Sequence, residues 1–277
     1  MNIESWLNLA ILQLNNLDNI NSRLDAEVLL SHILNRSISW IICNNSYIIS
    51  DNDLKQLNNL IKRRLNSEPI AYLIGKKEFW SLSLIVSRST LIPRPDTEIL
   101  VEQALMRLEN TNFKTVLDLG TGCGCIALAL ASMKSNCYVI GIDCIQESIN
   151  IARKNAENLH LDNITFFNSF WFSSVNRKFD IIVSNPPYIS LKEIDILEKE
   201  LLFEPMIALI STSSGLGSIN YIIKRSKKYL NNKGWLLIEH SWMQKVRVQK
   251  LFKKYGFINI ITYPDYSGHD RITVGQK

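Results

Sequence analysis

The sequence predicts an α/β protein in which a mostly parallel sheet with an antiparallel edge strand follows a small helical domain and a β-hairpin linker. Three observations predict this class. Apolar residues recur at helical spacing over residues 1–75, strand and helix patterns alternate from Thr115 onward, and two strand patterns flank a turn near the C-terminus. We therefore divide the chain into a helical domain (1–75), a hairpin linker (76–97) and a sheet domain (98–277).

The first 75 residues are predicted to form helices. One apolar stripe with a spacing of three to four residues consists of Trp6, Leu7, Ala10, Ile11 and Leu14. We expect Ser22 to cap a second helix and Asp53 to cap a third, because short polar side chains accept hydrogen bonds from free N–H groups at helix starts. Gly75 is expected to end the last of these helices. The stripes predict a core rather than a reactive site.

The linker is predicted where the apolar period changes. Phe79, Leu82, Leu84 and Val86 stand among serines in a strand-like pattern, and Ser89-Thr90 predicts a turn. Pro93-Arg94-Pro95 predicts an extended segment, because each proline fixes its own φ and biases the residue before it. Thr97 is expected to cap the helix that follows, over residues 98–108.

The remaining chain is predicted to form a doubly wound sheet. The expected strands cover residues 116–119, 138–142, 164–168, 180–183 and 235–239, and the expected helices cover 126–133, 147–159, 219–229 and 244–254. This alternation is typical of parallel strands joined by crossover helices. Residues 258–263 and 271–275 flank Ser267-Gly268 and are predicted to pair antiparallel at the sheet edge.

Composition limits the functions that the chain can have. Hydrophobic residues make up 46% and charged residues 21%, which is ordinary for a globular protein. The net charge of +5 is small and its basic residues are scattered, so we expect no direct nucleic-acid partner. The 5 cysteines contain no CxxC pair, which predicts reduced thiols and no metal site. Without a signal peptide or an apolar run of roughly 18 residues, we expect a cytoplasmic monomer with no membrane partner.

A glycine-rich loop follows the first strand of the predicted sheet. Gly120-Thr121-Gly122-Cys123-Gly124 lies between a strand and a helix, where glycine lets the backbone turn tightly and approach a ligand. The next strand ends at Asp143, about 20 residues later, where a carboxylate can bind the hydroxyls of a ribose. The two features together predict a site for a nucleotide-containing cofactor.

The spacing of the glycines favours S-adenosylmethionine as that cofactor. The loop reads GxGxG rather than the GxGxxG of dinucleotide sites, and Asp118 stands two residues before it. A negative charge there suits the methionine end of a sulfonium cofactor and would repel a pyrophosphate. A dinucleotide site and a purely structural turn remain the alternatives.

Asn185-Pro186-Pro187-Tyr188 follows directly on the predicted strand 180–183. The prolines remove backbone donors and leave carbonyls as the free polar groups. A planar NH2 group could donate one hydrogen to the Asn185 side-chain oxygen and the other to the Pro186 carbonyl, while Tyr188 stacks on its face. We therefore predict that Asn185 and Pro186 are catalytic, and that Asn185 to Tyr188 bind the substrate. The alternative is a rigid turn that ends a strand.

This arrangement suits methylation of an amide nitrogen, which is a poor nucleophile because its lone pair is delocalised. Holding both N–H bonds toward acceptors aims the lone pair at a methyl group and positions it for in-line displacement. The methylated nitrogen becomes acidic, so no strong base is needed before attack. None of the four histidines is therefore assigned a catalytic role.

The chain resembles the release factor glutamine methyltransferases nearly end to end. Besides the two motifs above, the resemblance rests on Arg23 to Glu27, Glu68 to Tyr72, Glu78-Phe79-Trp80, Ile92 to Glu98, Phe203-Glu204-Pro205 and Glu239-His240. It implies a helical domain that docks a peptide chain release factor and a Rossmann-like class I methyltransferase domain. The implied reaction methylates N5 of the glutamine in a Gly-Gly-Gln motif.

The resemblance also implies which residues bind S-adenosyl-L-methionine. They are Gly120, Thr121, Gly122, Cys123, Gly124, Asp143, Trp171 and Asn185. Phe170 departs from the family pattern, since an acidic residue that binds the adenine amino group usually stands there. Leu202 replaces a basic residue that often precedes Phe-Glu-Pro.

Two other functions compete with this interpretation. An enzyme that methylates the exocyclic amino group of adenine or guanine in RNA or DNA could use the same tetrapeptide, but a base-reading module would be expected and residues 1–75 are not markedly basic. A binding protein without turnover would explain Phe170, but Gly120, Gly122, Asp143 and Asn185 argue against it. Measurements of cofactor affinity beside turnover would separate the binding protein from the enzyme.

Overall fold

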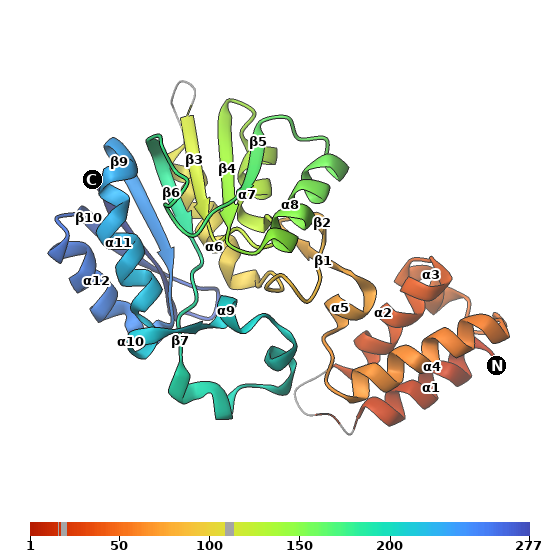
Figure 1. Ribbon diagram of the computed structural model, residues 1–277. Helices are drawn as coiled ribbons and strands as arrows, with labels where there is room; N and C mark the ends of the chain where they lie inside the picture. Colours follow the sequence, from red (N-terminus) through yellow and green to blue (C-terminus); the bar gives the residue numbers. More distant parts are fainter. Residues whose placement is uncertain (16, 18–20, 109–113) are drawn as a thin grey trace. The chain divides into compact units, whose positions relative to one another are not determined.

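The computed structural model describes residues 1–15, 17, 21–108 and 114–277 (Figure 1). The described residues form two compact units. The smaller unit contains residues 1–76 together with 198–203, and the larger contains residues 77–197 and 204–277. The smaller unit is therefore discontinuous in sequence. Among the described residues, no helix is both long and apolar enough to cross a membrane.

The smaller unit is helical, as predicted. Its helices are α1 (Ile3–Leu14), α2 (Ser22–Leu34), α3 (Ile38–Cys43), α4 (Asp51–Leu65) and α5 (Ile70–Ile74), and η3 (Lys199–Phe203) joins them from later in the chain. Trp6, Ala10 and Leu14 of the predicted stripe are buried in its core, with Leu29 and Leu57. The short helices α3 and α5 were not predicted, because neither is long enough to show a period.

Two of the predicted helix caps are wrong by a few residues. Helix α2 is capped by Asn21, whose Oδ1 accepts from the N–H of Leu24 at 3.0 Å, and Ser22 is its first helical residue. Helix α4 is capped by Ser50, whose Oγ accepts from the N–H of Asp53 at 3.1 Å. In both cases a preceding residue of the same capping type takes the position. Gly75 ends α5 in the left-handed conformation, as predicted.

Arg64 is one of the buried charged residues of the smaller unit. Its guanidinium lies 2.7 Å from Asp25 of α2 and 2.7 Å from Glu200 of η3, and it also donates to the Glu68 carbonyl at 3.2 Å. Burial raises the pKa of Asp25, although its hydrogen bond with Arg64 acts in the opposite direction. These contacts join η3 to the helices of residues 1–76.

The expected hairpin forms from β1 (Lys76–Phe79) and β2 (Leu82–Ile85). A short 3-10 helix, η1 (Pro95–Thr97), leads into α6 (Glu98–Arg107). Arg94 is extended, as the flanking prolines predict. Thr97 occupies the predicted N-cap position of α6, but its side chain makes no capping hydrogen bond. The chain is already helical at that residue, so its hydroxyl is available for other contacts.

A seven-stranded sheet forms the centre of the larger unit among the described residues, in the order β10-β11-β9-β6-β3-β4-β5 (Figure 1). Its strands are β3 (Lys114–Leu119), β4 (Cys137–Asp143), β5 (Ile164–Asn168), β6 (Phe179–Ser184), β9 (Leu230–Glu239), β10 (Ile258–Pro264) and β11 (Asp270–Gln276). The predicted strands are all confirmed. Strand β11 runs antiparallel to both β9 and β10, so the antiparallel strand lies one position inside the edge.

Helices cover both faces of this sheet. Helices α6, α7 (Cys125–Met133) and α8 (Gln146–Asn158) pack beside one another, as do α11 (Gly217–Tyr229) and α12 (Lys245–Lys254). Alternate residues of a strand face opposite sides, and Leu117 and Leu119 of β3 share a buried cluster with Ile222 of α11 and Phe252 of α12. The doubly wound arrangement is thus confirmed.

Short elements follow β6 and β9 at the carboxyl ends of the strands. They are β7 (Ile189–Ser190), η2 (Leu191–Ile196), α9 (Met206–Leu209), β8 (Ile210–Ser211), α10 (Thr212–Gly215) and η4 (Trp242–Gln244), and β7 pairs with β8 in parallel. The strand order reverses at β3, which lies between β4 and β6. In open parallel sheets, ligands bind beyond the carboxyl ends of the strands at such a reversal.

Candidate active site

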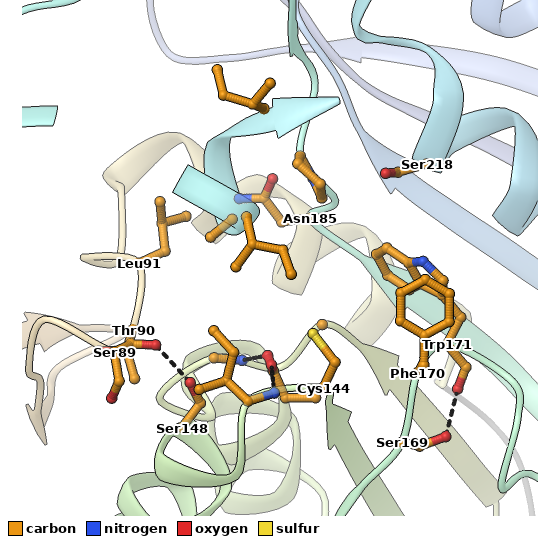
Figure 2. Close-up of a pocket in the computed structure, with 18 residues that line it drawn as sticks. Ser89, Thr90, Leu91, Cys144, Ser148, Ser169, Phe170, Trp171, Asn185 and Ser218 are labelled. Atoms are coloured by element: carbon orange, nitrogen blue, oxygen red, sulfur yellow. Dashed lines mark hydrogen bonds between the residues drawn. The ribbon is translucent and has the colours of Figure 1, made fainter. Parts of the chain in front are cut away.

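A pocket of the larger unit lies at this reversal. It brings together six of the predicted site residues, namely Gly120, Gly122, Asp143, Trp171, Asn185 and Pro187, and also Phe170. Figure 2 shows Asn185 and Trp171 on different sides of the pocket, with Ser148 and Cys144 below them. The glycines and Asp143 follow β3 and β4, Trp171 follows β5, and Asn185 follows β6.

The glycine loop has the conformation that its sequence predicts. Gly120, Gly122 and Gly124 all have positive φ, at 72°, 56° and 89°. A Cβ on Gly124 would lie 3.0 Å from side-chain atoms of both Leu128 and Phe166, so these side chains would have to shift to admit a larger residue. The N–H groups of Gly120 and Thr121 both donate to the carbonyl of Ile142, at 2.9 and 2.8 Å. The loop is therefore attached to the end of β4.

Asp143 connects the glycine loop to the start of α8. Its Oδ2 accepts from the N–H of Gly122 at 2.9 Å, and its Oδ1 accepts from the N–H of Ile145 at 2.9 Å. Burial raises the pKa of this carboxyl group, whereas the backbone donors lower it. Each carboxylate oxygen can accept further hydrogen bonds, so Asp143 is held rigidly and fits the predicted contact with ribose hydroxyls.

Asp118 lies fully buried behind the loop. Its Oδ2 accepts from the Thr121 hydroxyl at 2.6 Å, and its Oδ1 has no hydrogen-bond partner among the described residues. Burial, with a smaller contribution from the charge of Asp143, raises the pKa of Asp118 to about 7. A buried acceptor without a partner is costly, and a nearby cation would favour its ionised form. The charge on this side of the loop therefore fits a cationic cofactor better than a phosphate.

Two aromatic rings form another wall of the pocket. A Cβ built on Gly120 would lie 3.5 Å from the Trp171 ring, so the loop and the indole are in close contact. The centroid of the Phe170 ring lies 6.2 Å from that of Trp171, with an interplanar angle of 60° (Figure 2). The Phe170 side chain is 59% exposed and has no hydrogen-bonding group. Among the described lining residues, Asp143 is the one carboxylate.

The tetrapeptide after β6 is tightly packed. Asn185 lines the pocket, and its Nδ2 donates to Oγ1 of Thr97 at 3.2 Å. The carbonyl of Tyr188 accepts from Nε2 of Gln244 at 3.0 Å, and a Cβ on Gly215 would lie 2.1 Å from that carbonyl oxygen. Burial and the nearby charge of Glu239 raise the pKa of the Tyr188 phenol. Tyr188 is therefore a neutral ring at physiological pH.

Glu239 lies next to this tetrapeptide, at the end of β9. It is 1% exposed, and its Oε2 has no hydrogen-bond partner among the described residues. Burial raises the pKa of this carboxyl group to about 7, although Thr97 and Asn185 donate hydrogen bonds to it. A buried carboxyl group beside an active-site motif is typical of functional sites.

Five predicted site residues do not line the pocket. Thr121 bonds to Asp118, and the carbonyl of buried Cys123 accepts from Nδ2 of Asn155 at 2.9 Å. Gly124 begins α7. Pro186 and Tyr188 are not among the lining residues, whereas Asn185 and Pro187 are. These residues shape the site in the structure, and their direct contacts with a ligand stay predictions.

Sequence reasoning missed several lining residues. They are Ser89, Thr90, Leu91, Cys144, Ile145, Ser148, Ser169, Ile207, Ala208, Ile210 and Ser218. Ser89 is placed by its carbonyl, which accepts from the Ser148 hydroxyl at 2.7 Å across 59 residues of sequence. Nothing local to Ser89 indicates such a contact. A signal for Glu239 existed, because an acidic residue at the end of a buried strand is unusual.

Comparisons with known proteins agree with this geometry. The model of a methyltransferase domain matches residues 110–264, and that of a PrmC N-terminal domain matches residues 5–75. A model named protein-L-isoaspartate(D-aspartate) O-methyltransferase also matches residues 44–170. A release factor glutamine methyltransferase from Buchnera aphidicola subsp. Baizongia pistaciae is 58% identical over 277 residues, with all of both chains covered.

More distant relatives extend the agreement. A release factor glutamine methyltransferase from Escherichia coli is 42% identical over 277 residues, which cover 100% of this chain and 99% of that protein. The crystal structure of a methyltransferase from Pyrococcus furiosus has a TM-score of 0.56 at 18% identity, and covers 79% of this chain and 98% of that chain. At this identity the structural likeness concerns the fold alone.

Proposed function

The chain belongs to the family of release factor glutamine methyltransferases, and on that basis we propose that it methylates the side-chain amide nitrogen N5 of the glutamine in the Gly-Gly-Gln motif of peptide chain release factors. The methyl donor we propose is S-adenosyl-L-methionine. The observation that carries the proposal is the full-length identity of 58% to a protein of that name, together with the position of Asn185 in a pocket beside the glycine loop.

The pocket residues fit this cofactor. When bound, S-adenosylmethionine supplies a methyl group carried on a positively charged sulfur. The backbone of Gly120 and Gly122 would border the methionine portion, and Asp143 would accept hydrogen bonds from the ribose. Asp118 would place its negative charge behind the cationic end. Thr121, Cys123 and Gly124 would act by shaping the loop, and Trp171 would pack beside the adenosine.

The tetrapeptide would hold the glutamine amide. Oδ1 of Asn185 and the carbonyl of Pro186 would each accept one N–H hydrogen, and Pro187 and Tyr188 would pack against the amide plane. The nitrogen lone pair is then aimed at the methyl carbon, so a C–N bond forms as the S–C bond breaks. The nitrogen afterwards releases one proton to solvent. Asn185 and Pro186 would thus contribute positioning and electrostatic stabilisation rather than base catalysis.

We propose separate roles for the segments of the chain. Residues 1–75 would dock the release factor, and residues 76–97 would link this domain to the next. Residues 98–277 would bind the cofactor and transfer the methyl group. The match of a PrmC N-terminal domain to residues 5–75 supports the first assignment. We further propose that the protein works as a monomer in the cytoplasm. The free thiols of all five cysteines in the described chain support that location.

The function is tested by incubating the purified protein with a release factor and isotope-labelled S-adenosylmethionine, followed by peptide mass spectrometry. We expect one added methyl group on the glutamine of Gly-Gly-Gln, and none on a release factor in which that glutamine is alanine. Parallel incubations contain DNA or RNA. Transfer to nucleic acid alone would establish the base-methylating alternative, and no transfer to any of them would contradict the proposed function.

A further inference from the structure

We propose that Thr97 and Glu239 are positioning residues that determine which end of the Asn185 side-chain amide faces the substrate. This inference rests on the proposed function. The oxygen and nitrogen ends of an asparagine amide have nearly the same shape but opposite roles in hydrogen bonding. With Oδ1 toward the pocket, Asn185 accepts from the substrate NH2 group. With Nδ2 there, two donors would face each other and the substrate amide could not be held.

Thr97 contacts the nitrogen end of Asn185. Its Oγ1 accepts from Nδ2 at 3.2 Å, and the Thr97 side chain is 2% exposed, so water does not replace it. Thr97 alone does not determine the orientation. A hydroxyl group can also donate, and it could turn its hydrogen toward Oδ1 of a flipped Asn185.

Glu239 removes this ambiguity. Strands β6 and β9 are parallel neighbours in which Ser184 pairs with Ile238, so Asn185 and Glu239 occupy the next positions on adjacent strands. The buried carboxyl group of Glu239 receives hydrogen bonds from Thr97 and Asn185. Above about pH 7 this carboxyl group is ionised, and in that form it only accepts. It therefore takes the hydroxyl hydrogen of Thr97 and leaves the Thr97 oxygen to accept from Nδ2 of Asn185.

The result is a chain of hydrogen bonds with one direction. Nδ2 of Asn185 donates to Thr97 and to Glu239, and Thr97 donates to Glu239. Oδ1 of Asn185 is thereby the end left for the substrate. The hydrogen bonds in a chain that ends on a buried charge strengthen one another. A change at Glu239 therefore alters the hydrogen bonding of Asn185 through Thr97.

Other charged groups around Glu239 adjust this chain. Arg271 of β11, which lies 2.9 Å from Asp265 and 3.3 Å from Asp96, lowers the pKa of Glu239, whereas Asp96 of η1 raises it. The Tyr188 ring carries no charge. The neighbouring ring of His240 bonds to Thr273 and to the Ser241 carbonyl, and burial lowers its pKa, so it too is neutral near pH 7. Arg271 is thus the cation that favours the accepting form of Glu239.

The experiment compares Thr97→Val with Thr97→Ser. Valine keeps the shape of threonine but removes the hydroxyl, whereas serine keeps the hydroxyl. We expect Thr97→Val to lower kcat about tenfold, as for the loss of one buried hydrogen bond. Its affinity for S-adenosylhomocysteine should stay within about twofold of the wild type. Thr97→Ser should restore kcat to within about threefold.

A second background separates positioning from a structural role. In an Asn185→Ala protein the amide is absent, so Thr97→Val should cause no further loss of kcat. The proposal is overturned if Thr97→Val keeps the wild-type kcat, or if it lowers kcat by the same factor with and without Asn185. It is also overturned if Thr97→Ser is as slow as Thr97→Val.

A readout without turnover distinguishes this inference from the proposed function. In 15N-labelled protein, the side-chain NH2 signal of Asn185 is identified by its loss in Asn185→Ala. We expect Thr97→Val and Glu239→Gln to shift that signal and to speed its hydrogen exchange, and Thr97→Ser to do neither. An unchanged signal in both variants overturns the positioning role. A shifted signal in a protein that methylates no release factor would instead contradict the proposed function.

Discussion

Nδ2 of Asn185 lies 3.2 Å from Oγ1 of Thr97, a residue 88 positions earlier in the sequence. Asn185 follows the strand β6, and Thr97 ends the 3-10 helix η1 that follows the hairpin. The contact means that the segment before α6, which the sequence predicts to be a linker, also touches the candidate active site. It also explains why the Thr97 hydroxyl does not cap α6.

Replacing Asn185 with alanine is expected to abolish most turnover. The variant loses the acceptor for the substrate amide, and we expect kcat to fall at least about a hundredfold, as for the loss of a catalytic hydrogen-bonding group. The fold should persist, which circular dichroism and binding of S-adenosylhomocysteine would check. Wild-type turnover in this variant would refute the proposed mechanism.

Replacing Phe170 with aspartate is expected to strengthen cofactor binding. Phe170 lines the pocket without a hydrogen-bonding group, and a carboxylate there would accept from the adenine amino group. A gain of about 1–3 kcal/mol, or roughly one to two decades in Kd, would follow. Calorimetry with S-adenosylhomocysteine measures it, and Phe170→Leu serves as the matched control without an acceptor. Equal affinities of the aspartate and leucine variants would show that adenine lies elsewhere.

Cofactor affinity is expected to rise with pH around neutrality. The pKa of Asp118 is raised to about 7 by burial, so the group is protonated in the folded protein below that pH. A cation bound nearby favours the ionised form, so binding releases a proton and strengthens as pH rises through about 7. Kd for S-adenosylmethionine measured between about pH 6 and 8 would show this, beside Asp118→Asn, which should show a flatter profile. Parallel profiles for both proteins would exclude Asp118 as the titrating group.

The same pKa shift has the opposite effect on the protein without cofactor. The folded state holds a proton on Asp118 up to about pH 7, whereas the unfolded state releases it near the ordinary aspartate pKa of 3.8. The contribution of Asp118 to stability is therefore complete below pH 3.8 and declines as pH rises toward 7. Asp118→Asn should remove this decline from the pH dependence of the free energy of unfolding.

Gly124→Ala is expected to destabilise the larger unit more than Gly268→Ala. Both glycines have positive φ, at 89° and 84°, but a Cβ on Gly268 would meet nothing within 4 Å. The φ alone should cost about 1–2 kcal/mol in each variant. In Gly124→Ala the free energy of unfolding should fall by about 1 kcal/mol more, because neighbouring side chains crowd the added Cβ. Urea midpoints of the two variants measure the difference, and equal midpoints would mean that the contacts of Gly124 relax freely.

The fold could be predicted largely from periodicity, because the seven strands are either buried runs or alternating patterns of ordinary length. The helix end at Gly75 and the strand after Thr115 were also predicted from the local sequence, and tertiary structure did not change them. The predictions that were wrong concern helix caps, because nearby residues compete for the capping position. Asn21 and Ser50 cap the helices whose caps were predicted at Ser22 and Asp53, since nearby Ser, Asn and Asp residues offer nearly equal capping groups.

The residues of the candidate site also fall into those that the sequence predicts and those that it does not. Glycine spacing and the Asn-Pro-Pro-Tyr sequence are continuous in the chain, so the sequence alone is enough to recognise them. Thr97, Ser148 and Ser218 reach the site by tertiary packing from separate helices, and no short pattern connects them with Asn185. Glu239 carries a local signal as an acidic residue at the end of a buried strand, but placing it beside Asn185 requires the strand order, in which β9 is the neighbour of β6.

The discontinuity of the smaller unit has a consequence for the order of synthesis on the ribosome. Residues 1–76 emerge first, but the carboxylate of Glu200 that pairs with Arg64 emerges only after β3 to β6 have been translated. Until then the buried guanidinium has Asp25 as its acidic partner within these contacts. The nascent helices therefore reach their final electrostatic balance late, when the Asn-Pro-Pro-Tyr sequence has already been made.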